Sequence, residues 1–175
     1  MTDDPGPDDP EPVNPVPDDT RDVVALWRLQ SAYADVVTRR AWDELHGLFL
    51  PTTTVEVDTV TSPVRSFTGP AHFGAFVAAA IERYDHFAFV ILNTVVDVDP
   101  GGDEGSGRIF MCEIRHDAVT DDWHTAYGLY QDRYRRVEGR WRFAERRYRS
   151  LARTGPTPAV LGLPPNLPPI PPLGP

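Results

Sequence analysis

Two carboxylates, Asp132 and Glu145, stand in two extended runs of sequence that one short turn joins. The Glu138-Gly139 pair between the runs is typical of a two-residue hairpin turn. Counting outward from that turn predicts that Asp132 faces Glu145 directly across the hairpin. Because like charges repel, a partly dry site raises the pKa of one carboxyl of such a pair. The pair is therefore a candidate general acid or base, and a structural ion network is the alternative.

The same register places further functional side chains beside the two carboxylates. It pairs Tyr130 with Arg147, and Tyr134 with Phe143, on the face that carries Asp132. The opposite face carries Arg133, Arg135, Arg140, Arg142 and Arg146. Since five arginines do not easily line a core, we expect the arginine face in solvent and the aromatic face toward the interior. Arg147 and Tyr130 would then stabilise developing negative charge.

Glu113 and Arg115 share one face of the preceding extended run with Met111. If that face points inward, Glu113 is a buried carboxylate, and Arg115 is its ion-pair partner or a clamp for a substrate anion. If Phe110 and Cys112 point inward instead, both charges are solvated. The sequence does not fix the register of the following turn, so both arrangements stay open.

Tyr33 and His86 complete the candidate set. Tyr33 lies on the apolar side of a predicted helix, where its hydroxyl could contact a substrate or simply pack in the core. His86 directly precedes an extended run and is the histidine candidate for catalysis. His116 and His124 have no third ligand at fixed spacing, so no metal site is expected. No glycine motif for nucleotide phosphates occurs, and we expect no cofactor.

The elements that position these residues follow from apolar spacing and chain breakers. Helical spacing predicts a first helix over 20–40, a short amphipathic piece that ends at Pro51, and a third helix that starts at Gly69-Pro70. Beyond it come the extended runs Phe87–Val98, Arg108–His116, Trp123–Val137 and Arg140–Ser150. Helices followed by a meander of long strands predict an α+β fold with helices on one face of a curved, mostly antiparallel sheet.

The two ends of the chain differ from its middle. Six of the 19 prolines lie in residues 1–19 and nine in 155–175. Proline at that density donates few ladder or helix hydrogen bonds. We therefore predict a disordered acidic arm over 1–19, one domain over 20–154, and a flexible proline-rich tail over 155–175.

Charge and composition narrow the partners. The net charge of −9 arises mostly from seven acidic residues in the N-terminal arm, so the domain itself is close to balance and nucleic acid is not an expected partner. A single cysteine, Cys112, excludes an internal disulfide framework. No apolar run suits a membrane span, and we expect a cytoplasmic protein without membrane contact. All 17 basic residues are arginine, which suggests a GC-rich bacterial source.

Several short motifs occur in an order that resembles the SnoaL-like branch of the nuclear transport factor 2-like superfamily. They are Tyr33-Ala34, Trp42-Asp43-Glu44-Leu45, Leu48-Phe49, the Gly69-Pro70 helix start, and the stretch from Tyr134 to Phe143. The resemblance covers about residues 21–150. It implies a cone-shaped α+β barrel whose open mouth holds a hydrophobic pocket. Relatives include scytalone dehydratase, ketosteroid isomerase, limonene epoxide hydrolase and proteins without known catalysis, so the fold alone does not decide the function.

The dehydratase-like catalytic pattern matches this chain poorly. Its helix aspartate falls on Thr38, the tyrosine before it on Val37, its second-strand histidine near Arg115, and its asparagine near Tyr130. His86 alone fits a pocket histidine. We expect a protein that binds a small hydrophobic, oxygenated molecule and acts by cofactor-independent proton transfer, as an isomerase, dehydratase or cyclase. The alternative is a non-catalytic ligand-binding or dimerisation module, and a homodimer is expected because relatives often form one.

Overall fold

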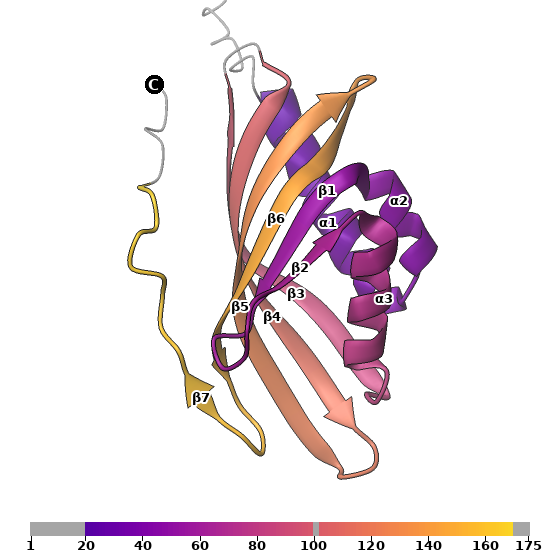
Figure 1. The fold of residues 1–175 in the computed structure, drawn as a ribbon, viewed down its shortest axis with the longest axis vertical. Coiled ribbons are helices and arrows are strands. Elements are labelled where there is room, and N and C mark those ends of the chain that lie inside the picture. Colours follow the sequence, from indigo (N-terminus) through magenta and orange to yellow (C-terminus); the bar gives the residue numbers. More distant parts are fainter. Residues whose placement is uncertain (1–19, 100–101, 170–175) are drawn as a thin grey trace, which may run out of the picture.

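The computed structural model describes residues 20–99 and 102–169, so the predicted arm over 1–19 lies outside it. Helix α1 spans Thr20–Arg39 (Figure 1). Its buried side chains recur at helical spacing and are Leu26, Leu29, Gln30, Tyr33, Val36 and Val37. Because Gln30 stands within this otherwise apolar stripe, α1 carries one amide group into the core.

Short helices follow α1 and lead into the third predicted helix. Trp42–Glu44 form a 3-10 turn, Leu45–Leu48 form α2, and α3 spans Pro70–Ile81 with its proline at the first position, as predicted. Gly69 precedes α3 with a φ of +80°, and a Cβ there would lie 3.0 Å from the carbonyl oxygen of Pro51. Glycine at this position is therefore required by both backbone conformation and space.

The strands of the described residues form one seven-stranded sheet. Its strands are β1 (Phe49–Asp58), β2 (Arg65–Thr68), β3 (His86–Val98), β4 (Glu104–Asp117), β5 (Asp122–Val137), β6 (Arg140–Arg153) and β7 (Ala159–Val160). The order is β2-β1-β6-β5-β4-β3, with β7 added to β6, and β1–β6 is the parallel pair. The predicted α+β class is confirmed, but the sheet is an open, curved one with β2 and β3 as its edges, not a closed barrel.

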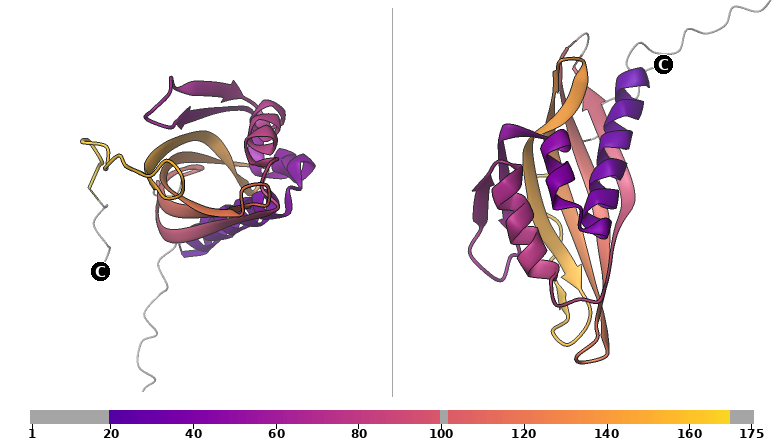
Figure 2. Two further views of the ribbon diagram at one scale, coloured as in Figure 1. Left: turned by 90° about the horizontal axis from the view of Figure 1, so that it is seen from below. Right: turned by 90° about the vertical axis from the view of Figure 1, so that its right-hand side faces the viewer.

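The helices lie against one side of the curved sheet (Figure 2). Helix α1 packs along the edge strand β3, and α3 contacts β1 and β2. We call the side turned toward the helices the inner face and the opposite side the outer face. We call the end with the β5–β6 turn the upper end and the end with the β4–β5 turn the lower end, as drawn in Figure 1.

The β5–β6 hairpin starts as predicted and then changes register. Glu138 and Gly139 both have positive φ, which is typical of a type I′ turn, and the pairs next to the turn are the predicted ones, including Tyr134 with Phe143. The register then shifts by one residue, because Ala144 has no partner on β5. Beyond this bulge, the side chains of β6 that were predicted to face outward point inward, and those that were predicted to face inward point outward.

The bulge corrects two predicted pairs. Asp132 lies opposite Arg146 instead of Glu145, and Tyr130 lies opposite Tyr148 instead of Arg147. Strand β6 also continues beyond its predicted end, and its last residues pair with β7. The stretch predicted to be a flexible tail therefore contains a short strand.

Candidate functional site

The inner face has at its upper end a buried ion pair between Arg146 and Asp132. Both side chains have 0% exposure. Arg146 Nε donates to Asp132 Oδ1 at 2.8 Å, and Nη2 donates to Oδ2 at 2.7 Å, which is a bidentate arrangement. Burial works against the guanidinium charge, but the charge and hydrogen bonds of Asp132 outweigh it and raise the pKa of Arg146. Arg146 therefore keeps its charge in the core.

Two further side chains hydrogen-bond to this centre, although Arg146 Nη1 has no partner among the described residues. Gln30 of α1 donates from Nε2 to Asp132 Oδ2 at 2.7 Å and accepts from Arg146 Nη2 at 2.8 Å through Oε1. The Tyr134 hydroxyl donates to Asp132 Oδ2 at 3.2 Å. The polar residue within the apolar stripe of α1 thus ties the helix to the sheet.

Aromatic rings enclose the Arg146 guanidinium. Its central carbon lies 4.2 Å from the ring centroids of Tyr33 and Tyr130 and 4.0 Å from that of Phe143, which are cation–π distances. Burial raises the pKa of Tyr33, Tyr130 and Tyr134, so all three hydroxyls stay protonated at neutral pH. The upper half of the inner face is a packed aromatic core around one cation.

The occupied oxygens of Asp132 limit what it can do chemically. Each oxygen already accepts at least one hydrogen bond from the protein, and the carboxylate has no contact with solvent. A general base needs an oxygen that can reach a substrate proton. Asp132 is therefore placed to fix Arg146 and α1. Four of the predicted site residues lie together around the Arg146–Asp132 pair, and they are Tyr33, Tyr130, Tyr134 and Phe143.

Three predicted site residues lie on the outer face instead. Glu145 is 48% exposed and approaches Arg133 at 3.9 Å, while Arg147 pairs with Glu56 at 3.2 Å. The prediction that Glu145 and Arg147 face the interior is wrong, because the Ala144 bulge turns both outward. His86 is also exposed, since the inward position at the start of β3 belongs to Phe87.

Glu113 and Arg115 face the interior, which resolves the arrangement that the sequence left open. Ile109 and Met111, on the same face of β4, are fully buried. The side chains of Glu113 and Arg115 keep 14% and 25% of their exposure and form an ion pair with each other. Only one oxygen of Glu113 is bonded to Arg115, and the other has no side-chain partner within the described residues. The lower end of the inner face thus carries a carboxylate that a solute can reach.

Strand pairing shows which side chains surround Glu113. Ala126 of β5 lies beside Glu113, and Arg153 of β6 lies beside Ala126, so all three share one row of the inner face. His124 pairs with Arg115 in the next row down. Arg153 and His124 were not among the predicted residues, because the first lies beyond the predicted end of β6 and the second depended on the unresolved β4 register.

Tyr84 covers this lower cluster from the loop between α3 and β3. Its ring lies 5.8 Å from that of His124, and the Arg115 guanidinium carbon lies 5.4 Å from its centroid. The Nε2 atom of His124 is buried without a hydrogen-bond partner among the described residues. A buried imidazole nitrogen without a protein partner leaves a hydrogen-bonding position for a water molecule or a ligand group.

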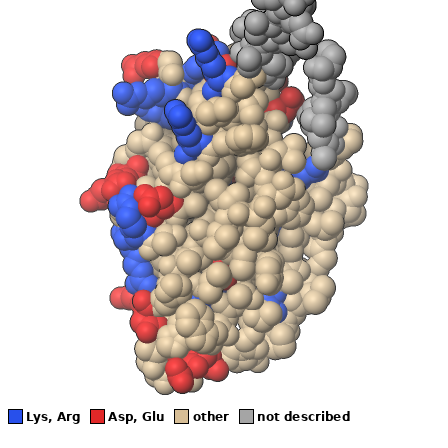
Figure 3. All heavy atoms as spheres, turned by 180° about the vertical axis from the view of Figure 1, so that it is seen from behind, with Lys and Arg blue, Asp and Glu red and all other residues tan. Residues whose placement is uncertain are grey.

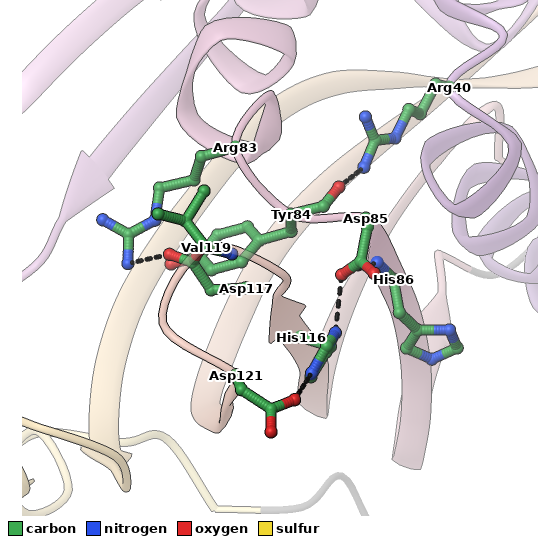
Figure 4. A network of polar contacts seen from close by, with 9 residues as sticks. All are labelled: Arg40, Arg83, Tyr84, Asp85, His86, His116, Asp117, Val119 and Asp121. Carbon is green, nitrogen blue, oxygen red and sulfur yellow. Dashed lines mark hydrogen bonds and ion pairs between the residues drawn. The ribbon is translucent and has the colours of Figure 1, made fainter.

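A network of polar contacts holds the loop that carries Tyr84 (Figure 4). Arg40 donates to the Tyr84 carbonyl oxygen, and Arg83 pairs with Asp117 at 2.8 Å. His116 stands between Asp85 at 2.7 Å from Nδ1 and Asp121 at 3.2 Å from Nε2. An imidazole can donate to both carboxylates only when it is protonated.

The two carboxylates change the titration of this histidine. Hydrogen bonds with Asp85 and Asp121 raise the pKa of His116, and the bond to His116 lowers the pKa of Asp85. We call Asp85, His116 and Asp121 the clasp, because they join the α3–β3 loop, strand β4 and the β4–β5 turn. The clasp lies at the rim of the lower cluster.

The outer face carries a separate hollow of about 620 Å³. Side chains of β1, β3, β4, β5 and β6 line it, and Pro168 and Pro169 of the C-terminal segment form part of its wall. Arg108 Nη1 donates to the Pro168 carbonyl oxygen at 2.7 Å across it. Acidic and basic side chains alternate along this hollow, for example Arg135 with Glu104, so it has no excess of one charge.

Seen from the side that carries β3 and α1, the surface has a broad area with few charged side chains (Figure 3).

No candidate metal cluster and no candidate membrane span occurs within residues 20–99 and 102–169. These residues contain no cluster of three or more His, Cys, Asp or Glu side chains that could hold a metal ion. None of their helices has the length and apolar character of a membrane span.

Comparisons with known proteins agree with this architecture. The sequence profile of the SnoaL-like domain family matches residues 18–147. No curated protein sequence matched. Among solved structures, a scytalone dehydratase candidate from Novosphingobium aromaticivorans superposes with a TM-score of 0.67 at 20% identity, over 81% of this chain and 92% of that chain.

Two further solved structures have similar scores. A type 2 hexachlorocyclohexane dehydrochlorinase, LinA, gives a TM-score of 0.67 at 15% identity, over 84% of this chain and 96% of that chain. A protein of unknown function from Mycobacterium tuberculosis gives 0.66 at 21% identity, over 78% and 76%. At these identities the likeness establishes the fold and not the activity.

Proposed function

The chain belongs to the SnoaL-like domain family, and we propose that it binds a small, largely apolar, oxygenated molecule at the lower end of the inner face and moves a proton on it. The reaction class is isomerisation, dehydration or cyclisation without a cofactor. Structural neighbours described as a scytalone dehydratase candidate and as a dehydrochlorinase are consistent with elimination chemistry in this fold.

Glu113 carries this proposal. It is the inner-face carboxylate with a free oxygen, and its other oxygen is held by Arg115, which fixes its direction. A positioned carboxylate that is partly removed from water is a suitable general base for a carbon-bound proton. Protonated Glu113 can then return the proton to another carbon of the substrate, or to a leaving hydroxyl group.

The remaining inner-face groups have supporting roles in this proposal. His124 lies in the row next to Glu113 and supplies a polar hydrogen there, while Tyr84 covers the site from the side of the helices. Asp132, Tyr33, Tyr130, Tyr134 and Phe143 hold the Arg146 centre and form the closed upper wall. They keep the sheet rigid, so that the lower cluster has a fixed geometry.

A general probe of proton abstraction tests the assignment of Glu113. The ring opening of 5-nitrobenzisoxazole needs only a base positioned beside an apolar surface, and its rate is followed by absorbance. We expect wild-type protein to accelerate it above acetate at equal concentration. Glu113→Gln should lose this rate, and the outer-face control Glu145→Gln should keep it. A wild-type rate equal to acetate, or equal rates for Glu113→Gln and wild type, would remove the proposal.

A second candidate function is assembly through the outer face. Leu92, Trp123 and Tyr127 are large apolar side chains that remain 56%, 60% and 39% exposed. Exposed apolar side chains on a sheet are typical of an interface between chains. We propose that two copies of the chain meet on this face, which leaves the inner face free for a ligand. The molar mass in solution tests this proposal.

A further inference from the structure

The lower end of the inner face has an excess of positive charge, and we propose that it binds the carboxylate group of an otherwise apolar, aromatic-sized substrate between Arg115 and Arg153. The inference rests on the proposed function only in placing the substrate beside Glu113. It adds the charge class of the substrate, which the fold does not specify.

The strand register brings the two arginines to one place. Arg153 and Glu113 lie two strands apart in one row, about 10 Å between backbones at the usual strand spacing. Arg115 lies two residues further along β4 and points to the same face. Ala126 lies between Glu113 and Arg153 in that row, and its short side chain does not separate the two longer ones. Arg153 Nη2 donates to Thr61 Oγ1 at 3.0 Å, and its remaining guanidinium hydrogens are left for a ligand.

The electrostatics of Tyr148 agree with this placement. Burial raises the pKa of the Tyr148 phenol, and the positive charges of both Arg115 and Arg153 act in the opposite direction. Both guanidinium groups are therefore within electrostatic reach of the Tyr148 hydroxyl, one row above Ser150. A carboxylate placed near that hydroxyl would face two cations at once.

The carboxylates around this cluster do not cancel its charge. Glu113 faces the same space and neutralises one of the two arginines. Asp117 is paired with Arg83, and the clasp holds its two aspartates on His116. Arg153 has a hydroxyl partner in Thr61 but no carboxylate partner among the described side chains, and a bound anion would stabilise a partly buried cation of this kind.

The polarity of the surrounding side chains agrees with a carboxylate on an apolar body. Guanidinium groups match the two oxygens of a carboxylate in one plane, and the unpartnered Nε2 of His124 can donate to it as well. Beside this charged end, the inner face continues with Phe87, Phe89 and Met111, which are buried and apolar. These residues would contact the hydrophobic part of the ligand.

Calorimetric titration with 2-naphthoate and its neutral analogue 2-naphthamide tests this inference on the full chain. We expect 2-naphthoate to bind at least tenfold more tightly, because hydrogen bonds to charged groups contribute more than neutral ones. Arg115→Gln and Arg153→Gln should each weaken naphthoate binding about tenfold and leave naphthamide unchanged. The matched control is Arg135→Gln, an exposed outer-face arginine paired with Glu104, which should bind as wild type.

Glu113→Gln gives a prediction of opposite sign. Removing its negative charge should strengthen naphthoate binding, even though the same variant loses proton abstraction under the proposed function. A damaged fold would weaken naphthoate binding, so stronger binding in Glu113→Gln cannot result from a damaged fold. Equal affinity for naphthoate and naphthamide, or wild-type affinity in both arginine variants, would overturn the carboxylate site. Proton abstraction that survives in Glu113→Gln, together with stronger naphthoate binding, would overturn only the catalytic role of Glu113.

Discussion

Replacing one partner of the buried Arg146–Asp132 pair should destabilise the fold far more than replacing Glu145. Glu145 is the residue that would face Asp132 if the hairpin had no bulge. In Asp132→Asn, Arg146 keeps its charge but loses its counter-charge in a site with no solvent contact. Breaking a buried ion pair from one side typically costs about 3–5 kcal/mol. Because Asn also donates where Asp accepts, one of the contacts from Arg146 and Gln30 is lost as well.

The matched variant is Glu145→Gln. Its carboxylate is half exposed and approaches arginines only at 3.9 Å and 4.0 Å. An exposed pair of this kind contributes about 0–1 kcal/mol, so this variant should unfold almost as wild type does. The two substitutions remove the same charge from neighbouring strands, and they differ in the burial and in the hydrogen bonding of the carboxylate.

Urea unfolding followed by far-UV circular dichroism measures both changes in the free energy of unfolding. Equal m-values would show that the denatured states are comparable. A loss below about 1 kcal/mol for Asp132→Asn would contradict the buried centre. A loss in Glu145→Gln as large as that in Asp132→Asn would mean that the bulge at Ala144 does not exist in solution.

Three further predictions address space, pH and assembly. Gly128→Ala would place a Cβ 2.2 Å from Tyr148 Cε2 and should lower the free energy of unfolding by about 1–3 kcal/mol. The control Gly47→Ala, whose Cβ would have no atom within 4 Å, should not destabilise the fold. Thermal unfolding compares the two, and equal melting temperatures would refute the close packing of Tyr148 on Gly128. Because the pKa of His116 is raised, the stability that protonated His116 gives the clasp is fully present below the ordinary histidine pKa of 6.5 and is lost as pH rises through the raised pKa. Amide exchange in residues 84–86 should therefore accelerate with pH beyond the intrinsic chemical rate, and this excess should vanish in His116→Gln. An excess that persists in that variant would exclude the clasp as its cause. Tyr127→Lys on the outer face should convert a dimer to a monomer in light scattering, while a wild-type protein that is already monomeric would refute assembly through this face.

Local signals in the sequence predicted the elements well. The helical stripe of α1, the Gly69-Pro70 helix start and the turn at Glu138-Gly139 each depend on neighbours in the chain, and all three occur in the structure. The curved sheet with helices on one face follows from the order of those elements. Turn chemistry and periodicity are local, and for that reason they can be read from one sequence.

The composition of the buried centre depended on a long-range contact. One unpaired residue, Ala144, decides whether Arg146 or Glu145 faces Asp132. The bulge brings a cation to Asp132 and to Gln30, which lies more than a hundred residues away in sequence. The polar Gln30 within the apolar stripe of α1 was the one available signal that a polar centre lies beneath the helix.

The orientation of the side chains in the lower cluster could not be predicted from the sequence for a similar reason. The direction of Glu113 depends on the β4–β5 register, which extends down to the pair of Asp117 with Asp122 next to the turn. A shift of one residue would have turned Glu113 and Arg115 into solvent. His124 and Arg153 could not be assigned to the cluster before that register was known.

A crystal structure of the protein with 2-naphthoate would show whether the lower end of the inner face is the small-molecule site. We expect the carboxylate between Arg115 and Arg153 and the naphthalene rings against Phe87 and Phe89, within reach of Glu113. Naphthoate bound in the outer-face hollow beside Arg108, with the inner face unchanged, would contradict it.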